Sequence, residues 1–178
     1  AEIESRLQEI AAQGVPNYFG EQRFGHDGGN LVEAQTLIER DQLKGNRSGT
    51  GMYLSAARSW LFNLVLAERL RRDCWQSPLD GEIEPSGPLW GRGRSVVTGD
   101  LADLEQTVLA NWQSWCYALE HAGLQQERRP LILRPQSMAW RRLQSDQLEL
   151  SFVLASGCFA TVILREVAEL FRPQFKPL

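Results

Sequence analysis

The sequence predicts an α+β protein. Apolar residues recur at helical spacing through most of the first two thirds of the chain, whereas after Pro130 the pattern changes to alternation over residues 148–154. Segments rich in glycine and proline separate these stretches, and both residue types interrupt regular structure. At 178 residues, 43% of them hydrophobic, the chain is long enough to bury a core as one domain or as two small ones.

Apolar faces predict five helices, at residues 1–13, 31–40, 54–72, 100–121 and 158–171. The pattern is strongest at 54–72, where Ser55 is placed to cap the first turn. Arginines crowd the last turns of that helix, as the helix dipole favours. In the helix at 100–121, Asp100 is the expected N-cap, and Gly123 is the residue expected to close the C-terminal end.

Strands are expected after Pro130. Residues 148–154 place apolar side chains at every second position, and Ser145-Asp146 between two apolar runs indicates a hairpin turn. The helix that follows Gly157 is expected to cover this hairpin. Residues 77–99 hold three prolines and several glycines, so this segment is expected to be a loop with short strands.

The net charge of −3 argues at first against a nucleic-acid partner, but the basic residues are unusual. Only Lys44 and Lys176 are lysines, so 17 of the 19 basic residues are arginines. Arginine binds phosphate through two donors and stacks on bases, which suits RNA. A genome biased toward arginine codons explains the same composition, so composition leaves both explanations open.

Three widely spaced cysteines, Cys74, Cys116 and Cys158, favour reduced thiols in a cytoplasmic protein over a disulfide framework. A metal site is not expected, because the chain has 2 histidines and no CxxC pair. No stretch approaches the roughly 18–20 consecutive apolar residues of a membrane span. The sequence therefore predicts a cytoplasmic protein without a membrane segment.

Most short motifs in the chain do not support a catalytic site. Gly28-Gly29 is not followed by the lysine of a phosphate-binding loop, and neither Ser48 nor Ser55 has a histidine at the spacing of a hydrolase triad. The basic loop at residues 91–94 is placed to touch phosphate, although a solvated turn has the same composition.

The segment at residues 17–25 differs, because it interleaves aromatic rings with amide and guanidinium side chains between glycines. Single bases are read by aromatic stacking and by hydrogen bonds to their edges. Glycine also lets the backbone approach a ligand closely. From these residues alone two interpretations stay open, namely a site for RNA or another ligand, or a buried aromatic turn.

Residues 17–25, which read Asn-Tyr-Phe-Gly-x-Gln-Arg-Phe-Gly, resemble the signature of the TruD family of tRNA pseudouridine synthases. Further stretches match in the family's order: Leu-Ser-Ala-Ala-Arg-Ser-x-Leu-Phe-Asn at 54–63, Ser-Gly-Pro-Leu-Trp-Gly at 86–91, Leu-x-Pro-Gln at 133–136 and Ala-Ser-Gly-Cys-Phe-Ala-Thr at 155–161. The resemblance extends over nearly the whole chain. It implies conversion of a uridine in tRNA, typically at position 13, to pseudouridine, without a cofactor or metal.

The resemblance also implies which residues bind the substrate. Phe19 matches the family's aromatic residue that packs on the target base, and Asn17 matches a polar residue beside it. The further expected substrate-binding residues are Gln22 and Arg23 in the same signature, Arg58 in the long helix, and Arg165 near the C-terminal motif. An ion pair between Arg165 and Glu166 is the structural alternative for that last arginine.

The family's catalytic aspartate is not identified in this chain. In the family it belongs to a Lys-Asp motif upstream of the aromatic signature, and none of the aspartates here has that context. The chain also begins at Ala1 without a methionine. We therefore expect the catalytic aspartate to lie outside this chain.

The family architecture is a mixed β-sheet catalytic domain interrupted by an inserted α/β domain. By resemblance, residues 1–44 and 130–178 belong to the catalytic domain and residues 45–129 to the insertion. Family members usually carry a longer stretch near Gln76-Ser77, so either the insertion is trimmed here or residues are missing from the sequence. We expect the second.

The expected partner is tRNA, held by its backbone in an arginine-lined cleft between the two domains. The protein is expected to act as a monomer, with no protein partner and no membrane. One alternative is an RNA-binding module that keeps the fold without catalysis. The other is a structural interaction domain in which Phe19 only packs in the core.

Overall fold

The computed structural model describes residues 2–43, 49–93, 95 and 97–169. These residues form two compact units: unit 1 comprises Ala1–Val15 and Leu133–Leu178, and unit 2 comprises Pro16–Ile132. The chain changes unit within two short strands, β1 (Val15–Pro16) and β4 (Ile132–Leu133), which pair with each other. None of the described helices combines the length and apolar character that a segment crossing a bilayer needs.

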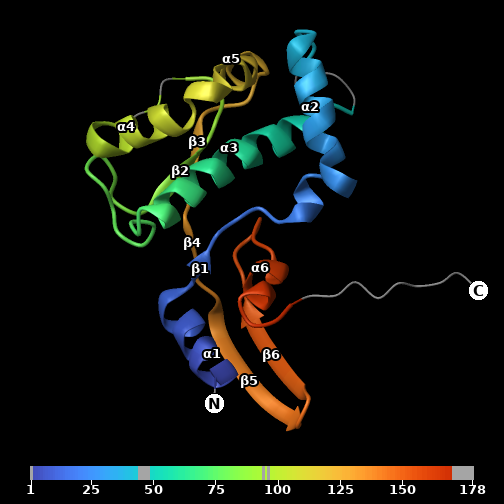
Figure 1. Ribbon diagram of the computed structural model, residues 1–178, viewed down its shortest axis with the longest axis vertical. Helices are drawn as coiled ribbons and strands as arrows, with labels where there is room; N and C mark the ends of the chain where they lie inside the picture. The colour runs from blue at the N-terminus through green and yellow to red at the C-terminus, as the bar shows by residue number, and fades with distance from the viewer. Residues whose placement is uncertain (1, 44–48, 94, 96, 170–178) are drawn as a thin grey trace, which may run out of the picture. The chain divides into compact units, whose positions relative to one another are not determined.

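Unit 2 is built around the helix α3 (Gly51–Arg71), as Figure 1 shows. The elements that pack against α3 include α2 (Gly29–Glu39), α4 (Gly99–Val108), α5 (Gln113–His121) and the strand β2 (Ser86–Leu89). Because α3 is covered on several sides, its buried residues do not form a single stripe. The largest core cluster includes Leu61 and Val65 of α3 together with Leu119 of α5.

The strand β2 pairs in antiparallel fashion with β3 (Glu127–Pro130) and crosses α3 closely. A Cβ atom on Gly87 would lie 2.9 Å from the ring of Phe62 on α3, so only glycine fits at this crossing. Within the expected loop at 77–99, β2 is a short strand of the expected kind, and the contact with the helix explains Gly87.

The helix expected at 100–121 is interrupted at Leu109. The chain leaves α4, makes a short 3-10 turn, η3 (Ala110–Trp112), and enters α5. This turn brings Trp112 against two other indoles, with ring centroids 5.9 Å from Trp60 and 5.0 Å from Trp115. Trp112 thus packs on both indoles at the point where the helix breaks. The expected closing glycine is confirmed, since Gly123 has φ of +87° just after α5.

Two expected helix caps are wrong. Thr50 precedes α3 without a side-chain cap, and Ser55 lies inside the helix. Similarly, Thr98 is the N-cap residue of α4, while Asp100 lies in its first turn. A carboxylate in the first turn still interacts favourably with the helix dipole, so Asp100 stabilises the helix start in a different way.

The C-terminal end of α3 carries a buried ion pair. Arg69 is 0% exposed, and its Nη1 donates a hydrogen bond to Oε1 of Glu82 at 2.6 Å. Arg69 also donates to the carbonyl oxygens of Cys74 and Ser77. These bonds satisfy a guanidinium that burial would otherwise destabilise. They close the stretch that contains Gln76 and Ser77 into a short loop on the helix end.

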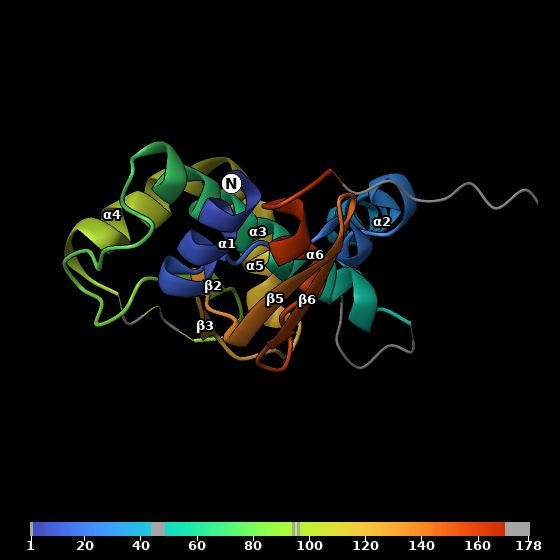
Figure 2. The ribbon, with the colours of Figure 1, turned by 90° about the horizontal axis from the view of Figure 1, so that it is seen from below.

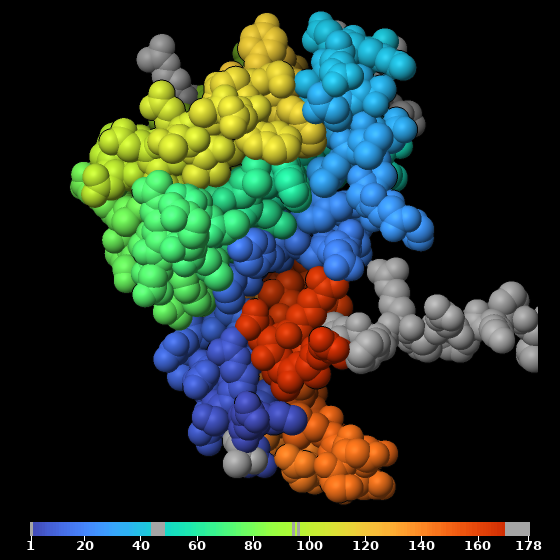
Figure 3. Space-filling model, in the orientation of Figure 1, coloured from blue at the N-terminus to red at the C-terminus, as the bar shows by residue number. Residues whose placement is uncertain are grey.

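Unit 1 consists of the helix α1 (Glu2–Gln13), a hairpin of β5 (Gln136–Gln144) and β6 (Gln147–Val153), and the helix α6 (Ala160–Arg165). Figure 2 shows the two strands of the hairpin side by side, and the expected turn at Ser145-Asp146 joins them. Ile10 of α1 and Val162 and Ile163 of α6 share one core, so α1 and α6 lie against each other (Figure 3). The helix α6 is shorter than the expected 158–171, and Phe171 lies outside the described residues.

The α+β class is confirmed, and the described strands form three two-stranded sheets. The larger mixed sheet of the expected catalytic domain stays a prediction.

Candidate functional site

An asparagine of α3 holds the loop that follows β1. The side chain of Asn63 accepts a hydrogen bond from the backbone N–H of Phe19 at 2.9 Å and donates one to the carbonyl oxygen of Phe19 at 3.0 Å. An amide side chain has an N–H donor and a carbonyl acceptor, as a peptide group does. The Asn63 side chain therefore pairs with the backbone of Phe19 as a neighbouring strand would. The position of Phe19 is therefore fixed by a well-packed helix.

The ring of Phe19 packs against another ring and two guanidinium groups. It meets Phe62 edge to face, with centroids 5.5 Å apart. The guanidinium carbon of Arg129 lies 4.1 Å from the centroid of the Phe19 ring, and that of Arg23 lies 5.3 Å away. Such a contact contributes about 0.5–2 kcal/mol, depending on how dry the site is. As a result, only 8% of Phe19 is exposed.

Asn17 is tied to the neighbouring strand and is 3% exposed. Its Nδ2 donates to the carbonyl oxygen of Pro130 at 2.8 Å, and its Oδ1 accepts from Nη2 of Arg129 at 2.7 Å. Its backbone N–H donates to the carbonyl oxygen of Leu131 at 2.8 Å. Both ends of the amide are thus engaged within the protein, and Asn17 joins the aromatic loop to the end of β3.

Arg23 is anchored on α3. Its Nη1 donates to Oγ of Ser55 at 2.7 Å, which gives that serine a role in place of the expected helix cap. Next to Phe19 in the chain, the pKa of the Tyr18 hydroxyl is raised by burial, so the phenol stays protonated at neutral pH. The cluster of Asn17, Phe19, Arg23, Asn63 and Arg129 is called the aromatic-loop cluster below.

Arg58 binds the backbone of two other segments. Its Nη2 donates to the carbonyl oxygens of Leu89 at 2.8 Å and Gln125 at 2.7 Å, and its side chain is 14% exposed. Burial lowers the pKa of Arg58 from its ordinary value, while the charge of Glu127 opposes that change. A guanidinium remains protonated in proteins, so Arg58 is a partly buried cation that joins the end of β2 to the backbone at Gln125.

The structure brings only part of the expected site together. Asn17, Phe19 and Arg23 belong to the aromatic-loop cluster. Gln22 lies on the same loop, in the 3-10 turn η1 (Glu21–Arg23), and is exposed. Arg165 is exposed near the end of α6 in unit 1, and its neighbour Glu166 pairs with Arg6.

Sequence reasoning did not identify Asn63 or Arg129 as members of the cluster. Asn63 ends the stretch at 54–63 that resembles the family, but nothing in that stretch indicates Phe19 as its partner. Asn63 is a polar residue between Phe62 and Val65 on a helix whose neighbouring positions are buried. Arg129 follows another arginine at the end of a short strand, where a charged side chain needs a partner.

The aromatic-loop cluster supplies groups for binding and not for proton transfer. All the aspartates are exposed, at positions 27, 41, 73, 80, 100, 103 and 146, and none takes part in the bonds given above. Within the part of the chain that the structure describes, no group of His, Cys, Asp or Glu residues is arranged to hold a metal ion. An aromatic ring beside amide and guanidinium groups suits a nucleic-acid base.

Comparison with protein families gives one match. Residues 79–167 match the family tRNA pseudouridine synthase D (TruD). The chain is 48% identical over 173 residues to "tRNA pseudouridine synthase D" of Cellvibrio japonicus, covering 96% of this chain and 52% of that protein. It is 42% identical over 195 residues to the protein of the same name from Aeromonas hydrophila, covering 94% of this chain and 55% of that protein. The chain thus spans about half the length of the curated relatives it matches.

A solved structure has a similar fold. The crystal structure of a Methanosarcina mazei protein that carries the TruD name superposes with a TM-score of 0.61 and 16% sequence identity. The match covers 93% of this chain and 64% of that protein. At this low identity the likeness bears on the fold, and it agrees with the α+β architecture described above.

Proposed function

The chain belongs to the tRNA pseudouridine synthase D family, and on that premise we propose that the full-length protein converts a uridine of tRNA, typically at position 13, to pseudouridine. The observation that carries the proposal is the family match over residues 79–167, supported by relatives of that name that align with 94–96% of this chain. We further propose that the protein works in the cytoplasm as a monomer, with tRNA as its partner.

The proposed reaction determines which groups the active site needs. The bond from N1 of uracil to C1′ of the ribose breaks, and a bond from C5 to C1′ forms. C5 loses its proton, and N1 gains one. The base must leave its stack for this, so the enzyme needs a ring or a plane to receive it. The catalytic aspartate is proposed to lie outside this chain, and the residues described here supply binding and positioning.

Phe19 is the proposed stacking residue, and the structure adds a condition to that role. The guanidinium of Arg129 lies over the ring, so a base that stacks on Phe19 must displace it or enter beside it. Asn17 is the proposed polar neighbour of the base, and its bonds to Arg129 and Pro130 support a role in orienting the loop.

The other proposed contacts differ in how well the geometry supports them. Gln22 and Arg165 are exposed and therefore accessible to RNA. Arg23 is half-buried and bonded to Ser55. Arg58 is supported least as a direct contact, because two backbone carbonyls already accept from its guanidinium.

The proposed domain limits remain those implied by the family, with residues 1–44 and 130–178 in the catalytic domain and 45–129 in the insertion. The compact units divide the chain at 15/16 and 132/133, so residues 16–43 pack with the middle of the chain. The proposed limit at 44/45 lies outside the described residues. Missing residues at Gln76-Ser77 stay a prediction.

The test measures loss of hydrogen from C5. Full-length protein is incubated with a tRNA transcript carrying tritium at C5 of uridine, and tritium released to water is counted over time. We expect release from one uridine per tRNA, and none from a transcript with cytidine at that position. The Phe19→Ala variant should stay folded and release tritium more slowly.

One outcome would overturn the proposed activity, and another would overturn the proposed role of Phe19. Binding of tRNA without tritium release would favour the alternative of an RNA-binding module without catalysis. If Phe19→Ala unfolds, that result by itself does not show whether Phe19 also stacks on the base. Phe19→Leu is therefore the second variant. It keeps most of the apolar volume and removes the ring, so full activity in that variant would exclude stacking by Phe19.

A further inference from the structure

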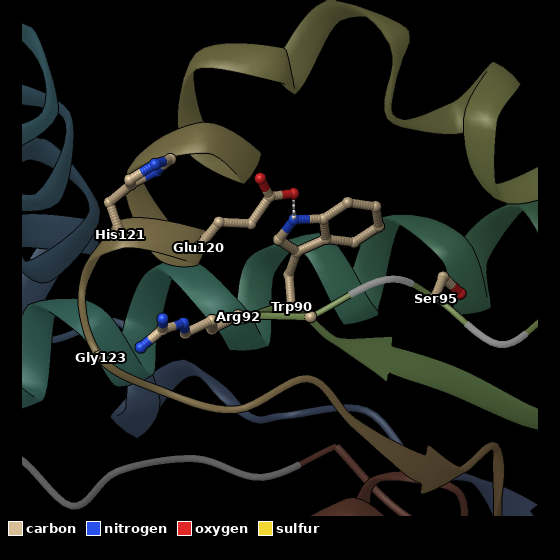
Figure 4. A pocket seen from close by; sticks show the side chains of 7 residues that line it. Trp90, Arg92, Ser95, Glu120, His121 and Gly123 are labelled. Atoms are coloured by element: carbon tan, nitrogen blue, oxygen red, sulfur yellow. Dashed lines mark hydrogen bonds between the residues drawn. The ribbon is translucent and has the colours of Figure 1, made fainter.

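A pocket of about 640 Å³ lies in unit 2 beside Trp90, and none of its lining residues belongs to the aromatic-loop cluster. Trp90 and Arg92 line it from the segment after β2, and Glu120 and His121 line it from the end of α5 (Figure 4). Its volume lies within the range of about 300–1,000 Å³ that is typical of small-molecule sites.

Backbone hydrogen bonds join two segments next to the pocket, residues 91–92 and 124–126. The backbone N–H of Arg92 donates to the carbonyl oxygen of Leu124, and the N–H of Gln126 donates to the carbonyl oxygen of Arg92. A Cβ atom on Gly91 would lie 2.5 Å from the carbonyl oxygen of Gln125, so glycine is required where the two segments meet. Arg58 bonds to the carbonyl oxygens of Leu89 and Gln125, which gives this partly buried cation a role in shaping the pocket.

The side chains of the pocket offer three kinds of contact. The indole Nε1 of Trp90 donates to Oε1 of Glu120 at 3.0 Å, which fixes both groups. Figure 4 shows this bond, and it shows Arg92 extending away from the indole toward Gly123. His121 stacks on Tyr117, with ring centroids 4.2 Å apart. An indole, a carboxylate and an exposed guanidinium therefore line one hollow.

We infer that this pocket binds a nucleotide of the tRNA at a point outside the uridine site. The base lies against Trp90, the second carboxylate oxygen of Glu120 accepts from an exocyclic amino group of the base, and Arg92 binds the phosphate. This inference rests on the proposed function, because it takes tRNA as the ligand.

The mixture of charges argues for a nucleotide over a simple anion. A carboxylate repels a free phosphate, so a site for phosphate alone would not have Glu120 in the same pocket as Arg92. A carboxylate does accept hydrogen bonds from amino groups on bases, as glutamate does from the amino group of cytosine. Base stacking on an aromatic side chain contributes about 1–3 kcal/mol per base. A solvated crevice with a structural Trp90 is the competing explanation.

The test measures binding of an unmodified tRNA transcript to full-length protein at fixed salt, with Arg92→Ala, Glu120→Gln and the control Arg40→Ala. Arg40 is also exposed in unit 2 and does not line the pocket, so its loss changes the charge equally. We expect Arg92→Ala to weaken binding about five- to tenfold and to lower the slope of log K against log salt by about one, as loss of one phosphate contact does. Arg40→Ala should stay within about twofold of the wild type.

Glu120→Gln gives the sharper result. The substitution removes a negative charge, so general electrostatics predicts tighter binding to a polyanion. The inference predicts weaker binding, because an amide that keeps its oxygen on Trp90 turns a donor toward the amino group of the base. Equal or tighter binding by Glu120→Gln, or equal effects of Arg92→Ala and Arg40→Ala, would overturn the inference.

Turnover separates this inference from the proposed function. Both pocket variants should raise KM for tRNA and keep kcat, since neither residue belongs to the aromatic-loop cluster. If the wild type releases no tritium, the proposed function fails. The tRNA-binding constants of the variants still show whether the pocket binds a nucleotide. If the wild type is active and the variants bind and turn over tRNA as it does, the pocket inference alone fails. Wild-type protein that does not bind tRNA would overturn both.

Discussion

Arg129 covers the ring of Phe19 at 4.1 Å and at the same time donates to Oδ1 of Asn17 at 2.7 Å. One side chain thereby links the aromatic group and the amide of the loop to the end of β3. The planar guanidinium makes this possible, because its face stacks on a ring while its edge donates hydrogen bonds. Arg129 therefore contributes both to the geometry of the loop and to the access to the ring.

Replacing Arg129 should therefore affect both stability and turnover. Arg129→Met removes the cation and the hydrogen bond to a buried amide, and we expect the free energy of unfolding to fall by about 1–3 kcal/mol. Arg129→Lys keeps the charge without the planar fork, so it should fold better than the methionine variant and still lose kcat/KM about tenfold. Urea unfolding and tritium release measure the two effects, with Arg40→Met as the control. A lysine variant with wild-type kcat/KM would contradict a special role for the guanidinium plane.

Asn63 gives a second prediction for the same loop. Asn63→Ala leaves the N–H and carbonyl of Phe19 without these partners, and we expect unfolding to become easier by about 2–3 kcal/mol. The matched control is Asn111→Ala, an exposed asparagine in η3, which should change stability by less than about 0.5 kcal/mol. Chemical denaturation of both variants checks the difference. Equal stabilities would mean that the loop is held by other contacts.

The elements that local pattern determines could be predicted from the sequence. The apolar face at 54–72 predicted α3 to within a few residues, because helix periodicity depends only on residues three or four positions apart. The hairpin was predicted for the same reason, since the alternation at 148–154 and the turn residues Ser145-Asp146 are both local signals.

Long-range partners were not accessible to such reasoning. Asn63 is 44 positions from Phe19, and Arg129 is 112 positions from Asn17. The local pattern does not indicate which asparagine pairs with the backbone of Phe19 or which arginine lies over its ring. The break at Leu109 was not predicted either, and beside it Trp112 packs on Trp60 of another helix.

The buried pair of Arg69 and Glu82 predicts a large effect from a small change. Glu82→Gln removes the charge that balances a guanidinium with 0% exposure, and breaking a buried pair costs about 3–5 kcal/mol. The control is Glu84→Gln, because Glu84 is exposed and two residues away. We expect thermal unfolding of the first variant to occur well below that of the second. A difference smaller than about 1 kcal/mol would show that the carbonyls of Cys74 and Ser77 satisfy the cation by themselves.

Binding of tRNA should depend steeply on salt. Phosphate contacts from arginine release counterions, so the logarithm of the binding constant falls linearly with the logarithm of the salt concentration. A protein that makes about six to ten such contacts loses roughly 10³–10⁵ in affinity between about 50 and 200 mM salt. Filter binding of full-length protein over that range measures the slope. A flat response would contradict a groove in which arginines hold the RNA backbone.

The thiol of Cys116 makes stability depend on alkaline pH. Burial, with a contribution from the charge of Glu120, raises the pKa of Cys116 from 9.0 to about 12. The unfolded chain therefore loses this proton above about pH 9, while the folded chain keeps it until about pH 12. The contribution of the protonated thiol to stability is complete below pH 9 and declines by up to about 1.4 kcal/mol per pH unit above it.

Cys116→Ala lacks this dependence, so the difference in unfolding free energy between wild type and variant should be constant from about pH 6 to 8 and should then shift in favour of the variant. Urea unfolding at matched pH values measures the difference, and parallel curves up to about pH 11 would show that Cys116 titrates normally in the fold.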